Sequence, residues 1–387
     1  MQLTCIYCEI ETFDQGKGSE EHVILSSIGG RKTSRSICCV SCNNRLGDEI
    51  DRPLTEGLKG LSNYIGVVTG RGKDSATLKN HDVYDGIMYD LTHGGRLQRS
   101  KIELSREIDE DNGLANISIV ARNTTELNKL FNQQIESFGE SIKSIQVKEI
   151  TEIIEYPNSL TLDIDIGLVS HYRSIAKSAL TYIGTVIAPE RLRNGLFLKL
   201  IEYIKGENDE LGLVAITKVT FPSMPNIFTM QHRIIISASS KKRMAIGLVE
   251  LFGGITFKVV LSDCWDGPNL QKGYAIDPIS GEHDECMSNL NLNDDHWLDQ
   301  PSDLTDQNYI DMMSKVMKNA IAQHTNLEHQ KLISETVSEF CQEFANRDLD
   351  DHLCMILSNR LTKALTDSIF KIKKKRNIEL SELTNQK

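Results

Sequence analysis

Cys5-Ile-Tyr-Cys8 and Cys39-Val-Ser-Cys42 enclose the stretch of sequence that decides the N-terminal fold. Two Cys-x-x-Cys pairs can each hold a metal ion from one side, which gives a closed tetrahedral site of four thiolates. Four soft sulfur ligands with no open position suit a structural Zn²⁺. Cys38 could be a ligand only in an alternative register. The competing interpretation, two independent redox motifs, lacks the βαβ pattern that thioredoxin-like motifs accompany.

The stretch between and beside these cysteine pairs carries residues suited to hydrolysis. Glu21-His22 lies between the pairs, and Asn43 directly follows the last cysteine. Cutting a phosphodiester needs a base that deprotonates water and a divalent cation that neutralises charge on the phosphate. Histidine suits the base, because its ordinary pKa of about 6.5 leaves it mostly neutral at physiological pH. Carboxylate and amide oxygens suit a hard cation such as Mg²⁺.

The order and spacing of Cys-x2-Cys, Glu-His, Gly29-Gly30 and Cys-x2-Cys-Asn resemble the HNH endonuclease family. The resemblance is to its cysteine-rich branch, which builds a ββα-metal finger around a structural zinc, and it covers roughly residues 1–55. It implies that His22 is the general base, on the first strand of a hairpin. It also implies that Glu21 and Asn43 bind a catalytic Mg²⁺ or Mn²⁺, kept apart from the zinc. The zinc ligands would be Cys5, Cys8, Cys39 and Cys42.

The chain departs from the family pattern in two places. The family's middle asparagine is missing from the stretch Lys32-Thr-Ser-Arg-Ser36, where Ser34 or Ser36 could orient the histidine loop instead. Gly47 stands where some members carry another ligand. Asp51 could face the same side as Asn43 or pair with Arg52 in solvent.

Each proposed ligand also has a structural alternative. Glu21 could be a solvated acid beside Glu20. Asn43 could be a helix N-cap, a position that asparagine favours, and this would not prevent it from binding a metal.

The charge of the chain is unevenly distributed. The net charge is −11, which argues against a surface coated for polyanions. Residues 23–47 nevertheless carry four basic side chains and no acid. A few contacts of this kind to a nucleic-acid backbone give salt-sensitive and largely sequence-independent affinity. The predicted nucleic-acid contacts are Arg31, Lys32, Arg35 and Arg45.

The remaining chain predicts an α+β protein in which the finger precedes a larger mixed region and a helical C-terminal segment. The predicted regions are a finger at 1–58, a connector at 59–82, an α+β control region at 83–286 (one unit, or two at 83–156 and 157–286), an acidic Asn-rich linker at 287–302 and helices at 303–387. Periodicity predicts a strand over 160–164, helices over 171–187 and 190–205, and strands over 213–221, 233–238, 245–252 and 255–261. Further helices are expected over 123–135, 309–321 and 333–344. Gly253-Gly254 is a hairpin turn signal.

No stretch reaches the roughly 20 apolar residues that a membrane-spanning helix needs, and the N-terminus lacks a signal-peptide pattern. We therefore expect a cytoplasmic protein without a membrane partner.

The resemblance implies a metal-dependent endonuclease that cuts DNA with little sequence preference under control of its C-terminal region. By analogy, this arrangement is similar to bacterial anti-phage effectors. The alternatives are a non-catalytic zinc module that binds nucleic acid or protein, and a nuclease that acts on RNA. Expected partners are DNA, a second copy of the chain, and an activating ligand or protein.

Overall fold

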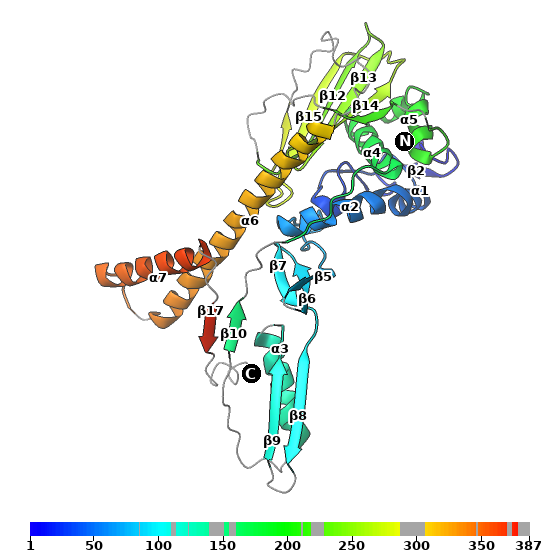
Figure 1. The fold of residues 1–387 in the computed structure, drawn as a ribbon. Helices are drawn as coiled ribbons and strands as arrows, with labels where there is room; N and C mark the ends of the chain where they lie inside the picture. Colours follow the sequence, from blue (N-terminus) through cyan, green and yellow to red (C-terminus); the bar gives the residue numbers. More distant parts are fainter. Residues whose placement is uncertain are drawn as a thin grey trace. The chain divides into compact units, whose positions relative to one another are not determined.

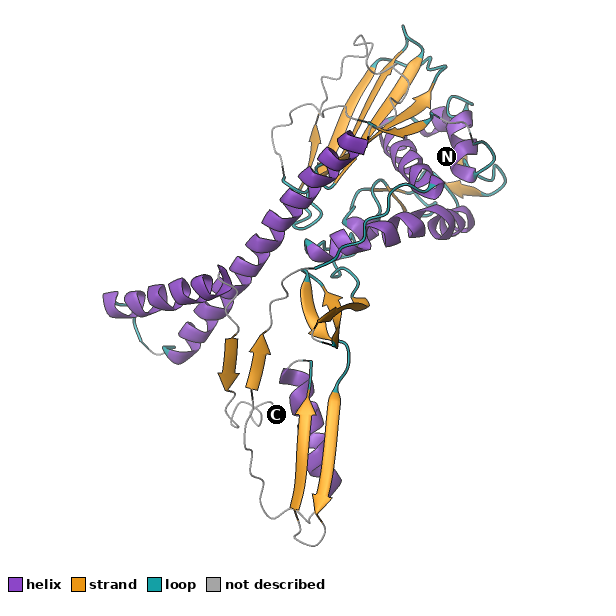
Figure 2. Ribbon diagram, viewed as in Figure 1, coloured by secondary structure: helices purple, strands orange, loops and turns teal. Residues whose placement is uncertain are grey.

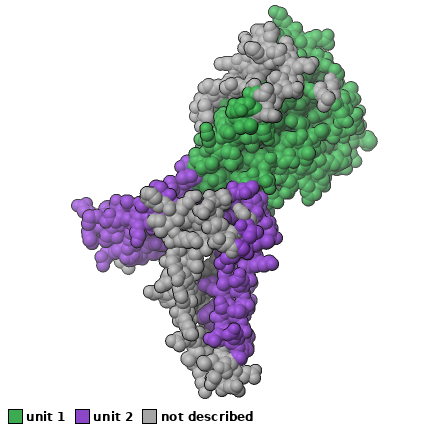
Figure 3. All heavy atoms as spheres, in the orientation of Figure 1, with its two compact units in different colours: residues 1–76, 93–95, 162–324 green, residues 77–92, 96–161, 325–387 purple. Residues whose placement is uncertain are grey.

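The computed structural model describes residues 1–84, 86–109, 114–122, 124–138, 151–154, 160–209, 212–217, 228–286, 306–345, 347–369 and 374–377. The chain divides into two compact units (Figure 3). Unit 1 comprises residues 1–76, 93–95 and 162–324, and unit 2 comprises residues 77–92, 96–161 and 325–387. Each unit combines segments that are distant in the sequence, whereas the predicted regions follow the chain in order. Those boundaries stay predictions, and the predicted linker at 287–302 lies outside the described residues.

The N-terminal part of unit 1 is built from short strands followed by one interrupted helix. Strand β1 (Gln2–Thr4) pairs with β2 (Thr12–Asp14), and β3 (Glu21–His22) pairs with β4 (Thr33–Ser34), both antiparallel. Helix α1 (Val40–Leu46) continues through a π-helical segment, η2 (Gly47–Asp51), into α2 (Arg52–Tyr64). A hairpin followed by a helix is the predicted ββα order. The first residues of the predicted connector are therefore helical.

A six-stranded antiparallel sheet forms the centre of unit 1 (Figure 2). Its strand order is β11-β14-β13-β12-β15-β16. The strands are β11 (Val214–Ile216), β12 (His232–Ser239), β13 (Met244–Leu251), β14 (Ile255–Ser262), β15 (Leu270–Ile276) and β16 (His283–Cys286). Gly253, at φ +65°, lies in the predicted turn between β13 and β14.

Helix α4 (Val169–Val186) packs against this sheet (Figure 1). Gly247 of β13 makes the close approach possible, because a Cβ there would lie 3.3 Å from the Cβ of Ala179. Most of α4 is buried, from His171 to Gly184. The segment after it differs from the predicted single helix over 190–205. A short 3₁₀ turn, η4 (Pro189–Arg193), is followed by a separate helix, α5 (Leu198–Lys205).

Two other predicted elements differ from the structure. Residues 160–164 form no strand. The helices expected over 309–321 and 333–344 are one continuous helix, α6 (Asp306–Glu343), which runs through the division between the units at residue 324. Nothing between the two predicted parts breaks a helix, since residues 322–332 contain neither Gly nor Pro.

In the described part of unit 2, the strands form two hairpin sheets and one further antiparallel pair. Strands β5 (Leu78–Tyr84), β6 (Ile87–Thr92) and β7 (Arg96–Arg99) form one sheet, β8 (Glu103–Asp109) pairs with β9 (Leu114–Val120), and β10 (Thr151–Ile154) pairs with β17 (Lys374–Asn377). Helices α3 (Thr124–Phe138) and α7 (Asp351–Ile369) belong to the same unit. Asn123, which should precede α3 as its cap, lies outside the described residues.

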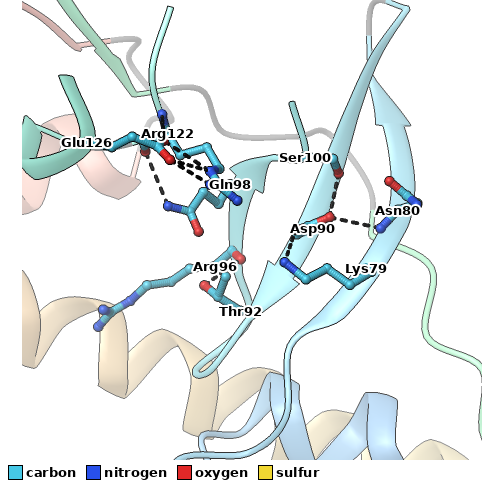
Figure 4. Close-up of polar contacts among 9 residues, drawn as sticks. All are labelled: Lys79, Asn80, Asp90, Thr92, Arg96, Gln98, Ser100, Arg122 and Glu126. Carbon is cyan, nitrogen blue, oxygen red and sulfur yellow. Dashed lines mark hydrogen bonds and ion pairs between the residues drawn. The ribbon is translucent and has the colours of Figure 1, made fainter. Parts of the chain in front are cut away.

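Asp90 holds the β5–β6–β7 sheet together (Figure 4). Its buried carboxylate accepts hydrogen bonds from Lys79, from the Asn80 backbone and from the Ser100 hydroxyl. Burial opposes ionisation, but these three bonds outweigh it and lower the pKa of Asp90 to about 2.

The α+β fold class is confirmed. No helix among the described residues is long and apolar enough to cross a membrane.

Candidate active site

Four cysteines converge on one point at the start of the chain. The Sγ atoms of Cys5, Cys8, Cys39 and Cys42 all lie within 4.8 Å of one another, and those of Cys8 and Cys39 are 4.0 Å apart. Thiolates on a tetrahedral zinc, with bonds of about 2.3 Å, would lie about 3.8 Å apart. The site therefore fits one shared zinc ion better than two independent redox motifs.

The backbone around Cys8 favours its thiolate, which is the form that binds a metal ion. Burial opposes the thiolate of Cys8, but hydrogen bonds from the backbone of Glu11 and Ile10 lower its pKa to about 7. Cys38 lies outside the cluster, and its thiol points at Oε2 of Glu21 at 3.8 Å. The alternative register is therefore not the one that the chain adopts.

The hairpin of β3 and β4 presents His22. Glu21 pairs with Ser34 and His22 with Thr33. The loop between them needs glycine at position 30, since a Cβ there would lie 1.8 Å from the carbonyl oxygen of Ile24. His22 is partly exposed. Its pKa is lowered, chiefly by burial, so its imidazole is neutral at physiological pH.

Asn43 joins helix α1 to the residues just before the strand that carries Glu21 and His22. Its amide nitrogen donates to the hydroxyl of Ser19 at 2.8 Å and to the carbonyl of Glu20 at 3.0 Å. It is not the N-cap of the helix, because Cys39 holds that position and its Sγ accepts from the backbone of Cys42. Asn43 therefore anchors the residues that lead into the histidine strand, whereas Ser34 or Ser36 had been predicted to orient the histidine loop. The hydroxyl of Ser34 accepts a local bond, from the backbone N–H of Ser36.

Glu21 lies in a buried ionic cluster. Its Oε1 is 2.7 Å from Nζ of Lys177, a residue of α4, and the same ammonium contacts Oδ2 of Asp51. The Glu21 and Lys177 side chains are each 2% exposed and that of Asp51 15%. The other carboxylate oxygen of Asp51 accepts from the hydroxyl of Ser174 at 2.7 Å. Glu21 is therefore not a solvated acid, and Asp51 faces the site while Arg52 pairs with Asp48.

The ammonium of Lys177, at the centre of this cluster, stays charged. Burial raises the pKa of Glu21 to about 7, although the neighbouring Lys177 lowers it. Burial disfavours the ammonium of Lys177, but Asp51 and Glu21 together raise its pKa above the ordinary value. In this arrangement the ammonium of Lys177 occupies the position between Glu21 and Asp51, so a divalent cation could bind these two carboxylates only in its place. The amide nitrogen of Asn43 is directed at Ser19 and Glu20.

The four basic side chains of residues 23–47 are engaged with partners of the same unit. Arg31 donates to the carbonyl of Ser280 at 3.2 Å, and Lys32 forms an ion pair with Glu285. The remaining two ion pairs are Arg35 with Glu20 and Arg45 with Glu49, each at 3.1 Å. All four are surface contacts of modest strength, which a phosphate group could replace.

The geometry of the cysteine cluster and the hairpin agrees with the comparison against known families: residues 5–59 match the family model described as HNH endonuclease. This segment is an HNH endonuclease domain. The HNH domain includes the four cysteines, the β3–β4 hairpin, α1, η2 and most of α2. No curated protein and no solved structure matches the chain.

Lys177 and Ser174 were not predicted as site residues. Both come from α4, far outside the HNH domain in the sequence. The available signal was a polar stripe in a mostly apolar helix, since His171, Ser174 and Lys177 are spaced three apart. Residues at such spacing share one helix face.

Proposed function

We propose that the HNH domain is an endonuclease that hydrolyses phosphodiester bonds in DNA, with His22 as the general base. The observation that carries this proposal is the partly exposed imidazole of His22, whose pKa burial lowers, in the strand that follows the Asn43-bound residue Glu20. A neutral histidine can accept the proton of an attacking water molecule. The match of residues 5–59 to the HNH endonuclease family supports the assignment.

We propose that cleavage depends on Mg²⁺ or Mn²⁺, with Glu21 and Asn43 as metal-site residues. Such an ion would neutralise the charge that develops on the phosphate. Zinc has a different part, because four cysteine ligands leave no position open for substrate.

We propose that recognition of DNA is largely independent of base sequence. Three of the four basic side chains near the site are ion-paired on the surface, which suits replacement of their partners by phosphates. The remainder of the chain would regulate the nuclease, since α4 supplies Lys177 to the HNH domain. A controlled nuclease of this kind would suit a bacterial anti-phage effector, acting as a dimer or on binding an activating ligand or protein.

The test is a cleavage assay on supercoiled plasmid and on RNA with Mg²⁺, with Mn²⁺ and with EDTA. We expect nicking or linearisation of plasmid with either ion and none with EDTA. Cleavage restricted to RNA would select the RNA nuclease instead. Metal-independent binding of nucleic acid without any cleavage would select the zinc module.

A further inference from the structure

Two carboxylates of the HNH domain contact the ammonium of Lys177, a residue that lies outside this domain in the sequence. Glu21 comes from β3, and Asp51 ends the π-helical segment η2. Nζ of Lys177 lies 2.7 Å from Oε1 of Glu21 and also contacts Oδ2 of Asp51. Lys177 is separated from Asp51 by 126 residues of sequence. Two carboxylate oxygens around one buried positive charge are also the arrangement that holds a hard divalent cation.

We propose that Lys177 is a positioning residue that acts as a tethered cation between Glu21 and Asp51, and that a divalent cation binds these carboxylates only in competition with it. Asp51 is then a second carboxylate of the metal site. This inference rests on the proposed function in one respect, that Glu21 is a metal ligand.

The charges of the cluster explain the competition. When both carboxylates are ionised, they and the ammonium carry a net charge of −1, so this form of the cluster attracts cations. An ammonium and a divalent ion cannot both lie between the same two oxygens, because their repulsion is strong in a buried site. One of them must leave.

The anchoring of the cluster decides which group moves. Asp51 is held by the hydroxyl of Ser174 through Oδ1, so Oδ2 stays directed at the same point. Glu21 pairs with Ser34 of β4 and directly follows Glu20, whose carbonyl accepts a hydrogen bond from Asn43. Lys177, in contrast, carries its charge on a flexible four-carbon stem. Withdrawal of this stem leaves two oriented carboxylate oxygens for the metal.

The decisive experiment measures Mn²⁺ binding to the zinc-loaded full chain without nucleic acid, from the electron paramagnetic resonance signal of free Mn²⁺. Lys177→Met and Lys177→Gln should each bind Mn²⁺ at least about tenfold more tightly than the wild type, because the competing charge is gone. Lys177→Arg, which keeps the charge, should stay close to the wild type. Adding Glu21→Gln to Lys177→Met should remove the gain. Binding by both neutral variants that is no tighter than wild type would overturn the proposal.

A second measurement needs no variant and covers the case in which the neutral variants do not fold. Reductive methylation of the wild-type chain followed by peptide mass analysis reports whether Lys177 is accessible. The ammonium should be protected without divalent ions, since its side chain is 2% exposed, and should become modified with saturating Mg²⁺. Equal protection with Mg²⁺ present would contradict displacement.

The experiments distinguish failure of the proposed nuclease function from failure of the proposed role of Lys177. Tighter Mn²⁺ binding by Lys177→Met without any DNA cleavage by the wild type would support the tethered cation and contradict the nuclease. Cleavage that depends on His22, together with unchanged Mn²⁺ affinity in the neutral Lys177 variants, would contradict only the tethered cation.

Discussion

The amide nitrogen of Asn43 lies 3.0 Å from the carbonyl oxygen of Glu20 and donates a hydrogen bond to it. This bond connects the first helix of the HNH domain to the residue before Glu21 and His22. The strand that presents His22 is only two residues long, so its own ladder holds it weakly. Asn43 therefore supplies part of the orientation that a general base needs.

Asn43→Ala should lower the rate of plasmid cleavage by about 10- to 100-fold while the bound zinc stays in place. The reason is loss of two hydrogen bonds that orient the histidine strand. Asn44→Ala is the matched control, because Asn44 is adjacent and exposed. Equal rates for the two variants would show that Asn43 does not act on the site.

Cys39→Ser should abolish zinc binding and destabilise the HNH domain, since a structural zinc contributes directly to folding. The measurements are zinc content by mass spectrometry and thermal unfolding. Cys341→Ser is the control, because Cys341 is exposed on α6. A Cys39→Ser protein that keeps a full equivalent of zinc would show that the cluster is not the metal site.

Gly30→Ala should destabilise unit 1 by on the order of 3 kcal/mol, because the new Cβ would clash with the carbonyl of Ile24. Gly47→Ala is the matched control. Gly47 has helical dihedrals, and a Cβ added there would meet no atom within 4 Å, so the change should be neutral or stabilise by about 0.5–1 kcal/mol. Urea unfolding followed by circular dichroism measures both, and a destabilised Gly47→Ala would contradict the expected contrast.

His232 should make unit 1 sensitive to acid. It is fully buried, lies 2.8 Å from the carbonyl of Ile28 through Nε2, and accepts the backbone N–H of Phe252 at Nδ1. Burial lowers its pKa from 6.5 to about 4, although the Ile28 carbonyl opposes this. Between these two values the unfolded chain binds the proton more readily, so stability falls as the pH falls. The loss from this residue is about 3 kcal/mol by pH 4.

The measurement is the free energy of unfolding in urea from pH 7 to pH 4. His232→Gln should be less stable at pH 7 but should lose less stability on acidification than the wild type. His352→Ala, at an exposed position of α7, should keep the wild-type slope. Parallel pH profiles for His232→Gln and wild type would contradict the claim that protonation of His232 lowers the stability of unit 1 in acid.

Local patterns predicted much of this protein, and contacts distant in sequence account for what was missed. The cysteine pairs, the Glu21-His22 strand and the turn at Gly253 each depend on neighbouring residues, so spacing reveals them. The continuous α6 was missed because local hydrophobic patches looked like separate helices. Lys177 could not be placed, because its partners Glu21 and Asp51 lie more than 120 residues earlier.

The rate of plasmid cleavage by His22→Ala tests the central claim most directly. In the presence of Mg²⁺ or Mn²⁺ the variant should cut at least about 100-fold more slowly than the wild type, which is the usual loss when a general base is removed. Its zinc content and unfolding temperature should match those of the wild type, and His352→Ala should cleave at the wild-type rate. Cleavage by folded, zinc-loaded His22→Ala at the wild-type rate would contradict the assignment of His22 as the base.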